Sequence, residues 1–195
     1  MKRVVFFIIA VVLSVTTIAQ LGAGPKAGLN KYALTGDDKS YLTALHLGGF
    51  VQIPVSGLFA VQPELLLSKQ GNAFEENGEK FGTYTTYLNI PVMLQVNTKS
   101  GFFAEAGPEF GFLLAAKNKE TGSPDVDVKN FFKSSNFSFG AGAGYRLKMG
   151  LGFGVRYNFG LANISSESNI ETKTTGGQVS VSYKFTATKK SKKTM

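Results

Sequence analysis

The chain has 195 residues, no cysteine and one histidine, with 21 Lys and Arg against 13 Asp and Glu. Two of the basic residues lie within 1–19 and four within 189–195, so residues 20–188 carry 15 basic against 13 acidic residues. This near-neutral body argues against nucleic-acid binding, which needs a basic surface. A chain without cysteine forms no disulfide, and a single histidine leaves zinc short of ligands. We therefore expect no nucleic-acid partner, no metal site and no cofactor.

The first residues predict an exported protein. Lys2 and Arg3 precede the apolar run VVFFIIAVVLSV (4–15), and small residues follow that run. A short basic start, an apolar run of this length and a small-residue cleavage motif are typical of a secretory signal peptide. The run is also short for a membrane-spanning helix. We predict a cleaved signal peptide over residues 1–19, with the cut after Ala19.

The remaining chain alternates apolar and polar residues with a period of two, which indicates β-strands with one apolar face. In YTTYLNIPVMLQV (84–96), for example, Leu88 and Ile90 share one face, while Asn89 and Gln95 lie on the other. The runs predict eight strands: 24–33, 42–54, 58–69, 83–96, 102–115, 136–146, 151–161 and 177–185.

The connections between these strands alternate in length. The first, third, fifth and seventh are long and polar, and the second, fourth and sixth are tight turns. Long loops at one end and short turns with both termini at the other are typical of an up-and-down outer-membrane barrel. We therefore predict an all-β protein: an eight-stranded antiparallel transmembrane β-barrel over residues 20–188, followed by a basic disordered tail over 189–195.

The glycine-rich stretch FGAGAGYRLKMGLGFGVRYNFG (139–160) raises the question of a phosphate-binding loop. A dinucleotide fingerprint needs G-x-G-x-x-G, but Tyr145 and Val155 stand where the third glycine would be. The glycines instead alternate with apolar residues along two strands joined by a turn at 147–150. They are predicted to line the inner face, where they leave room for larger side chains opposite.

The face opposite the apolar one carries charged residues, and this decides which face points inward. A soluble lipocalin-like carrier would turn its apolar face toward a ligand, whereas a membrane barrel turns it toward lipid. Buried charges are tolerable only when they are paired. We expect Arg156 to pair with Glu64 or Glu109, and Arg146 with Glu105. The predicted lumenal charge network is Glu64, Glu105, Glu109, Arg146 and Arg156, with Lys184 on the same face.

Two further features bear on the strands. Proline removes a backbone donor from the sheet ladder, and we expect bulges or strand ends at four positions: Pro54, Pro63, Pro91 and Pro108. His46 is the only candidate base for an acyl-transfer enzyme, and strand alternation points it into the lumen, away from lipid. It is therefore interpreted as a structural residue, and the protein as a non-enzyme with no catalytic residues.

Six blocks carry a family resemblance: GPKAGLN (24–30), VQPELLLSKQG (61–71), YLNIPVMLQV (87–96), GFFAEAGPEFGFLL (101–114), FGAGAGYRL (139–147) and VRYNFGLANI (155–164). In this order they resemble the PorT-like outer-membrane β-barrel family. The resemblance implies an eight-stranded barrel in a Gram-negative outer membrane, and the founding member is associated with protein secretion across that membrane. It brings no catalytic motif. The last strand, GQVSVSYKF (177–185), also resembles the aromatic-ended strands that the barrel assembly machinery reads.

The leading functional hypothesis is a structural or interaction role in the outer membrane, accessory to secretion if the resemblance extends that far. The expected partners are outer-membrane lipid, the assembly machinery during biogenesis, and an unidentified protein at the long extracellular loops. Phe131 and Phe132 are a possible contact in those loops, or alternatively part of an interfacial aromatic girdle. A lipid-modifying enzyme, a secreted lipocalin-like carrier and a diffusive pore are the alternatives.

Overall fold

The computed structural model describes residues 21–34, 41–76, 79–166 and 172–186, so the predicted signal peptide and basic tail lie outside the described residues. Eight long strands dominate this part of the chain: β1 (Gly22–Leu34), β2 (Tyr41–Ser56), β3 (Phe59–Glu76), β4 (Glu79–Asn97), β5 (Phe102–Glu120), β7 (Ser135–Arg146), β8 (Leu151–Gly160) and β9 (Thr174–Tyr183). The short elements are β6 (Val126–Asp127), β10 (Phe185–Thr186) and the 3-10 helix η1 (Lys129–Phe131).

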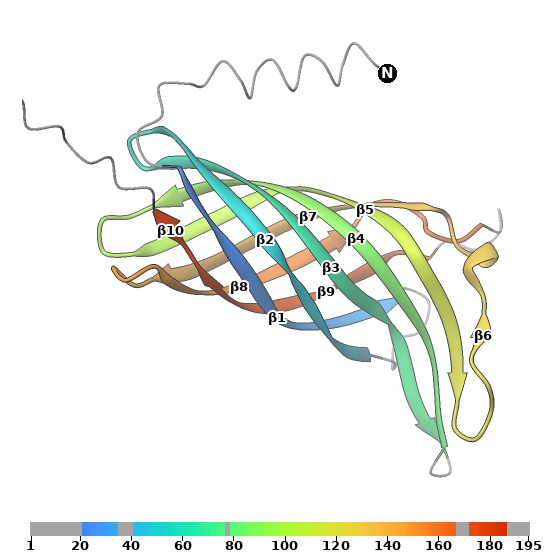
Figure 1. The fold of residues 1–195 in the computed structure, drawn as a ribbon. Helices are drawn as coiled ribbons and strands as arrows, with labels where there is room; N and C mark the ends of the chain where they lie inside the picture. Colours follow the sequence, from blue (N-terminus) through green and yellow to red (C-terminus); the bar gives the residue numbers. More distant parts are fainter. Residues whose placement is uncertain (1–20, 35–40, 77–78, 167–171, 187–195) are drawn as a thin grey trace, which may run out of the picture.

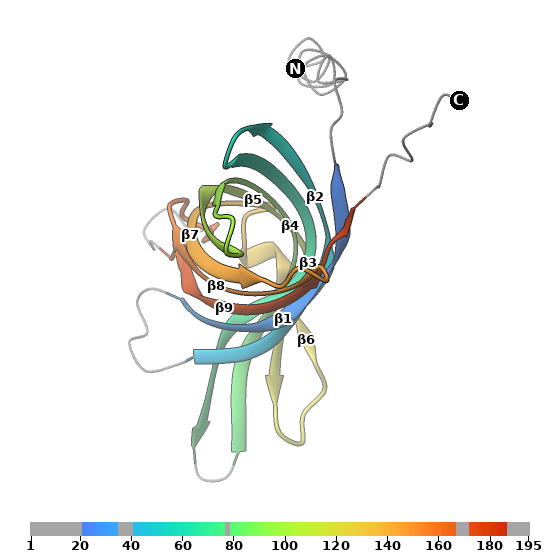
Figure 2. The same ribbon diagram turned by 90° about the vertical axis from the view of Figure 1, so that its left-hand side faces the viewer.

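The eight long strands close into a barrel. Each pairs antiparallel with the next, and β1 also pairs with β9, so that Leu29 lies opposite Val179. Figures 1 and 2 show the resulting cylinder and the two ends of the barrel. The turn end holds the three tight connections and both described termini, and the loop end holds the long connections. The predicted eight-stranded up-and-down barrel is confirmed.

Three strands extend well beyond their predicted bounds at the loop end. β3 continues to Glu76, β4 begins at Glu79, and β5 continues to Glu120. The sequence there is polar on both faces, and the period-two signal disappears because neither face is apolar. These extensions project from the barrel (Figure 1).

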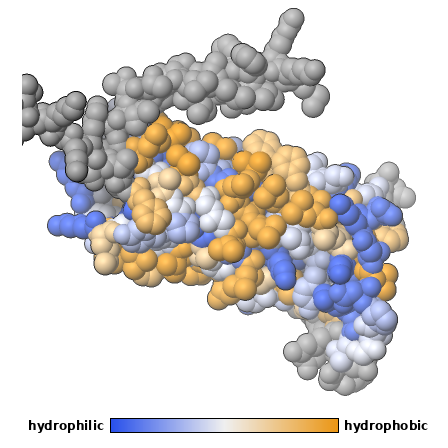
Figure 3. All heavy atoms as spheres, viewed as in Figure 1, coloured by the Kyte–Doolittle hydropathy of each residue, from blue (hydrophilic) through white to orange (hydrophobic). Residues whose placement is uncertain are grey.

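The apolar faces of the strands point outward. Leu45 and Val155 are 66% and 57% exposed, whereas Glu109 and Arg156 are each 4% exposed. On the face shown in Figure 3, apolar residues form a band around the middle, with hydrophilic residues toward both ends. A lipocalin-like carrier would have the opposite arrangement, so that alternative is excluded. Among the described residues, no helix is long and apolar enough to cross a membrane.

Glycines of β7 make room inside the barrel, as predicted. A Cβ on Gly142 would meet Arg156 on β8, and one on Gly144 would meet the ring of Phe103 on β5. Because a lumen of eight strands is only wide enough for side chains to fill it, each large inward group needs a small neighbour. The glycine-rich face therefore decides where Arg156 and Phe103 fit.

The prolines behave differently from the prediction at three of four positions. Only Pro54 adjoins a register shift in the β2–β3 ladder. At Pro63, Pro91 and Pro108 the ladder skips two residues and resumes in the same register. The expected bulges are therefore absent from these three sites, because the missing donor is accommodated by a gap in the ladder.

The loop end of the lumen is covered by a cap, which comprises residues 128–134 and 161–166. The two segments pair through a bridge between Phe132 and Ser165 and through Lys133 N–H donating to the Ile164 carbonyl at 2.8 Å. Val128 packs on a small apolar cluster with Tyr87, Leu113 and Ala116. The cap thus gives the barrel an apolar core at this end, above the polar lumen.

Candidate functional site: the lumen and the loop-end sheet

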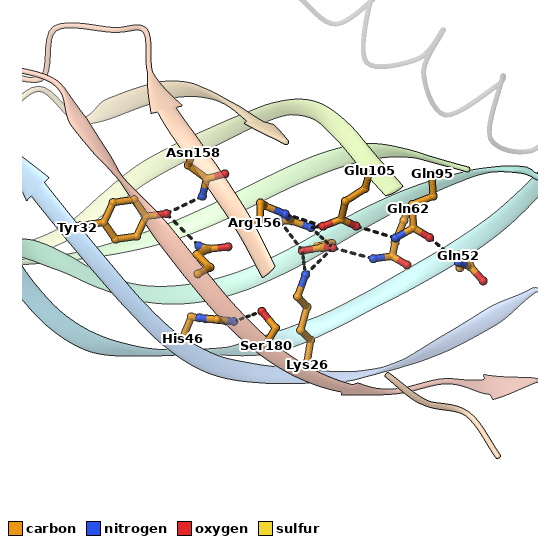
Figure 4. Close-up of polar contacts among 12 residues, drawn as sticks. Lys26, Tyr32, His46, Gln52, Gln62, Gln95, Glu105, Arg156, Asn158 and Ser180 are labelled. Atoms are coloured by element: carbon orange, nitrogen blue, oxygen red, sulfur yellow. Dashed lines mark hydrogen bonds and ion pairs between the residues drawn. The ribbon is translucent and has the colours of Figure 1, made fainter. Parts of the chain in front are cut away.

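Four charged side chains meet in the middle of the lumen. This lumenal charge cluster comprises Lys26 (β1), Glu64 (β3), Glu105 (β5) and Arg156 (β8). Figure 4 shows Lys26, Glu105 and Arg156 pointing toward one another. Arg156 donates to Glu64 from Nη2 at 2.8 Å and from Nη1 at 3.1 Å, and to Glu105 from Nε at 2.8 Å. Lys26 Nζ lies 3.0 Å from both Glu64 carboxylate oxygens.

The cluster is neutral and almost fully sealed. The two acidic and two basic side chains are each no more than 9% exposed. Buried ion pairs are tolerated when hydrogen bonds satisfy both partners, and Gln62 adds one to Glu64 at 2.8 Å. The arrangement fixes the positions of four strands but leaves no charge free for chemistry.

The structure brings some of the predicted lumenal residues together and separates others. Arg156 pairs with Glu64 and not with Glu109, which accepts instead from Asn89 Nδ2 at 2.9 Å. The expected Arg146–Glu105 pair is wrong, because Glu105 lies against Arg156. The Arg146 guanidinium instead lies over the rings of Phe103 and Phe50, 5.2 and 5.9 Å from their centroids.

The predicted lumenal charge network lacks Lys26, which the structure places in the cluster. Its signal is the alternation in GPKAGLN (24–30), which places Lys26 on the same face as Gly24 and Gly28, with Leu29 on the other. A lysine on the glycine face of a predicted lipid-spanning strand must point into the lumen, so the residue was predictable. Without it, Glu64 would have a single cationic partner.

Uncharged polar layers lie on both sides of the cluster. Toward the turn end, Gln52 donates to Gln95 at 2.6 Å, and Gln95 donates to Glu105 at 2.7 Å. Toward the loop end, the Tyr32 hydroxyl accepts from Asn158 at 2.6 Å and from Gln178 at 3.0 Å. The charge cluster lies between these two layers along the barrel (Figure 4).

His46 lies in the lumen, where the alternation placed it, and it has two side-chain partners. Its Nδ1 is 2.6 Å from Asn30 Oδ1, and its Nε2 is 3.0 Å from Ser180 Oγ. These distances match those of a serine, a base and an orienting amide in an acyl-transfer site. However, His46 and Asn30 are 1% exposed and Ser180 is 7% exposed, so lipid does not reach the serine. The chain of three is therefore a structural contact between β1, β2 and β9.

The described residues contain no group of three or more His, Asp or Glu side chains that could hold a metal ion. Asp125, in the connection between β5 and β6, pairs with Lys119 Nζ at 2.8 Å. The hydrogen bond from Lys119 lowers the pKa of this exposed carboxyl. The Asp125 carboxylate thus forms an ion pair with a neighbouring lysine.

A loop-end sheet projects beyond the cap. It comprises residues 69–76 of β3, 79–86 of β4, 115–120 of β5, and β6. The pairing of β3 with β2 ends at Ser68, whereas its pairing with β4 continues to Glu76. Figures 1 and 2 show β3 and β4 leaving the barrel wall together, away from β2. Beyond Ser68, therefore, no described residue of β2 pairs with β3.

The two adjacent phenylalanines near the loop end have different environments. Phe132 packs against the apolar cluster of the cap, whereas Phe131 is 59% exposed. Phe132 thus contributes to covering the lumen, and only Phe131 presents its ring at the surface.

Comparison with known proteins places this architecture in a family. The model of the family described as "Outer membrane protein beta-barrel domain" matches residues 16–166. The chain belongs to this family. No curated protein matches the chain in sequence.

Solved structures agree with the family assignment at the level of the fold. Ail, the attachment invasion locus protein of Yersinia pestis, solved with the heparin analogue sucrose octasulfate, is 12% identical with a TM-score of 0.52. Neisserial surface protein A (NspA) is 13% identical with a TM-score of 0.51. Each alignment covers 86% of this chain and 100% of the other. This family member therefore shares the barrel of small outer-membrane proteins.

Proposed function

We propose that the protein is an integral outer-membrane barrel with a non-enzymatic interaction role, and that the loop-end sheet is its contact surface. The observation that carries this proposal is the edge of β3 beyond Ser68, where pairing with β2 stops but pairing with β4 continues to Glu76. A strand edge that lacks a neighbouring strand is a template on which a partner protein can add a strand. In the membrane, the turn end faces the periplasm and the loop end faces outward.

Conduction and catalysis are less well supported by the interior. The charge cluster and the polar layers fill the lumen, and the cap covers its loop end. The serine and histidine that approach each other are sealed among the same side chains. The described interior therefore offers neither an open channel nor a serine that lipid can reach.

A role accessory to secretion follows as the finer proposal from the PorT-like blocks in the sequence. Such a role needs a protein partner at the membrane surface, and the loop-end sheet offers a surface to which that partner can bind. The complex of Ail with a sulfated heparin analogue is a property of Ail. Here the loop-end segments 31–43, 69–86, 115–135 and 161–175 hold nine basic and ten acidic residues, which favours a protein partner over a polyanion.

The test is site-specific photo-crosslinking in intact cells. A benzophenone amino acid at position 73, on the projecting part of β3, is expected to capture a protein partner. The same probe at position 65, which lies on the lipid-facing side of β3, is the matched control because Leu65 is exposed on the barrel wall. A protein adduct that forms equally at both positions, or at neither, would contradict the proposal.

A shortened hairpin provides an independent readout. Asn72 and Thr83 are directly paired, so residues 73–82 can be replaced by Asn-Gly, which forms a tight two-residue turn. Because position 73 is deleted in this variant, the benzophenone amino acid is placed at position 131 instead. We expect the variant to fold as a barrel and to form no adduct with the partner protein. A barrel that retains its adduct after this deletion would place the contact elsewhere.

A further inference from the structure

The turn end of the barrel contains a second feature, unrelated to the loop-end sheet. A cavity of about 450 Å³ lies between the connection at 97–101, the turn at 147–150 and the end of β9. Its lining is largely polar and includes four basic side chains: Lys99, Arg146, Lys148 and Lys184. We call this cavity the basic mouth. None of the described residues that line it is Asp or Glu, and in the sequence none occurs within 96–103, 146–151 or 182–186.

Arg146 lines the basic mouth and is partly buried. Phe50 and Phe103 lie against its guanidinium, and its buried Nε has no hydrogen-bond partner among the described residues. The carboxylate nearest to it in the lumen, Glu105, is paired with Arg156. A buried guanidinium nitrogen without an acceptor is costly. The positive charge of the same guanidinium favours an anion in the adjoining cavity.

Lys184 adds a second positive charge to the basic mouth. Its Nζ donates to Gln52 Oε1 at 3.1 Å, which is a neutral partner. Burial lowers the pKa of Lys184, and the positive charge of Arg146 lowers it further. The two cations therefore repel each other across the mouth. Lys99 and Lys148, both exposed on the two turns, increase the positive potential there.

The depth of the basic mouth in the membrane indicates which class of anion it binds. Outward aromatic pairs mark the turn end, with ring centroids 4.8 Å apart for Phe102–Tyr145 and for Tyr183–Phe185. Aromatic girdles of this kind sit at the level of the lipid headgroups. A rim of apolar residues with cations inside it matches a phosphate group better than a peptide carboxylate, because phosphate offers several oxygens to several donors.

We propose that the basic mouth binds a phosphate group, supplied by a phospholipid headgroup of the inner leaflet or by free phosphate. The fold explains the site: two tight turns and the last long strand bring three lysines around an arginine that has no carboxylate partner. The site is independent of the loop-end sheet, so either proposal can fail without the other.

The experiment compares the full chain with the variant Lys99→Gln/Lys148→Gln/Lys184→Gln. The matched control, Lys69→Gln/Lys129→Gln/Lys133→Gln, removes the same charge from exposed positions at the loop end. One arm measures binding of radiolabelled inorganic phosphate to the protein in neutral detergent. The other counts lipids retained by native mass spectrometry after release from nanodiscs of phosphatidylglycerol and phosphatidylcholine.

We expect the turn-end variant to bind phosphate roughly 100-fold more weakly, and the control to match the wild type. Retained phosphatidylglycerol identifies the lipid as the source, and phosphate binding without retained lipid identifies the free anion; both support the site. Equal losses in the two triple variants, or no binding in either arm, would overturn it. A chain lacking residues 189–195 is expected to bind as the full chain does, because the proposed binding residues are Lys99, Arg146, Lys148 and Lys184.

Discussion

Arg156 on β8 and Glu64 on β3 face each other across the lumen, with Nη1 3.1 Å and Nη2 2.8 Å from the two carboxylate oxygens. The same guanidinium donates through Nε to Glu105 on β5 at 2.8 Å. None of these three strands is a neighbour of another in the sheet. One side chain therefore links separate parts of the barrel wall, and its removal is the most direct test of what holds the interior together.

Arg156→Gln is expected to lower the free energy of unfolding by about 3–5 kcal/mol, because it leaves a buried carboxylate without its cation. Urea unfolding in phospholipid vesicles, followed by the gel mobility of the folded form, measures the change. The double variant Arg156→Gln/Glu105→Gln should recover part of this loss, because Lys26 and Glu64 then remain as a balanced pair. If the double variant were less stable than the single one, the charge cluster would not be the cause.

Arg146→Gln provides the contrast. This residue makes cation–π contacts and has no carboxylate partner, so the loss should be about 1 kcal/mol. The same unfolding measurement applies. A loss as large as that of Arg156→Gln would show that Arg146 has an ionic role in the lumen.

Gly144→Ala and Gly154→Ala test the packing of the glycine face, since the two glycines are directly paired across β7 and β8. A methyl group on Gly144 would collide with the ring of Phe103 and the Phe153 carbonyl, whereas one on Gly154 meets its nearest atom at 3.5 Å. We expect Gly144→Ala to cost about 1–3 kcal/mol of unfolding free energy and Gly154→Ala less than about 0.5 kcal/mol. Equal effects would refute a packing role.

His46→Ala and Ser180→Ala separate structure from catalysis. Each leaves a buried polar partner unsatisfied, so each should lower the unfolding free energy by about 1–3 kcal/mol. Neither should change the acyl-chain composition of outer-membrane lipids, which mass spectrometry of extracted lipid measures. An altered lipid profile from both variants, at unchanged protein level, would revive the lipid-modifying enzyme.

The purified barrel should give no stepwise conductance in planar bilayers, because side chains fill its lumen from the Gln52 layer to the cap. The control is the variant with residues 73–82 replaced by Asn-Gly, which shortens the loop-end sheet and leaves the lumen unchanged. Regular conductance steps from the wild type would contradict the filled interior.

The strands, the side of the barrel wall to which their residues point and the barrel topology follow from the sequence. The alternation of apolar and polar residues and the loop lengths are local signals. Leu45 and Glu64 could be assigned to opposite sides of the wall from their neighbours alone. Lys26 could have been assigned in the same way. The extra length of β3, β4 and β5 could not, since strands that leave the membrane need no apolar face.

The partners inside the lumen depend on register and shear, which the sequence does not encode locally. Arg156 and Arg146 lie on consecutive strands and both point inward, yet only Arg156 reaches the carboxylates of Glu64 and Glu105. The difference arises from how far each strand is shifted along its neighbour. For the same reason the basic mouth could not be foreseen, because it joins two turns separated by about fifty residues.

The gaps at Pro63, Pro91 and Pro108 all fall in the wall formed by β2 to β5, whereas the ladders joining β7, β8, β9, β1 and β2 run without a gap. Glu64 and Glu105 stand on the interrupted wall, and their cations stand on the continuous one. The ionic contacts thus brace the half of the cylinder whose main-chain bonding is incomplete. Weakening them should accelerate amide hydrogen exchange in β3 to β5 before it accelerates exchange in β8, β9 and β1.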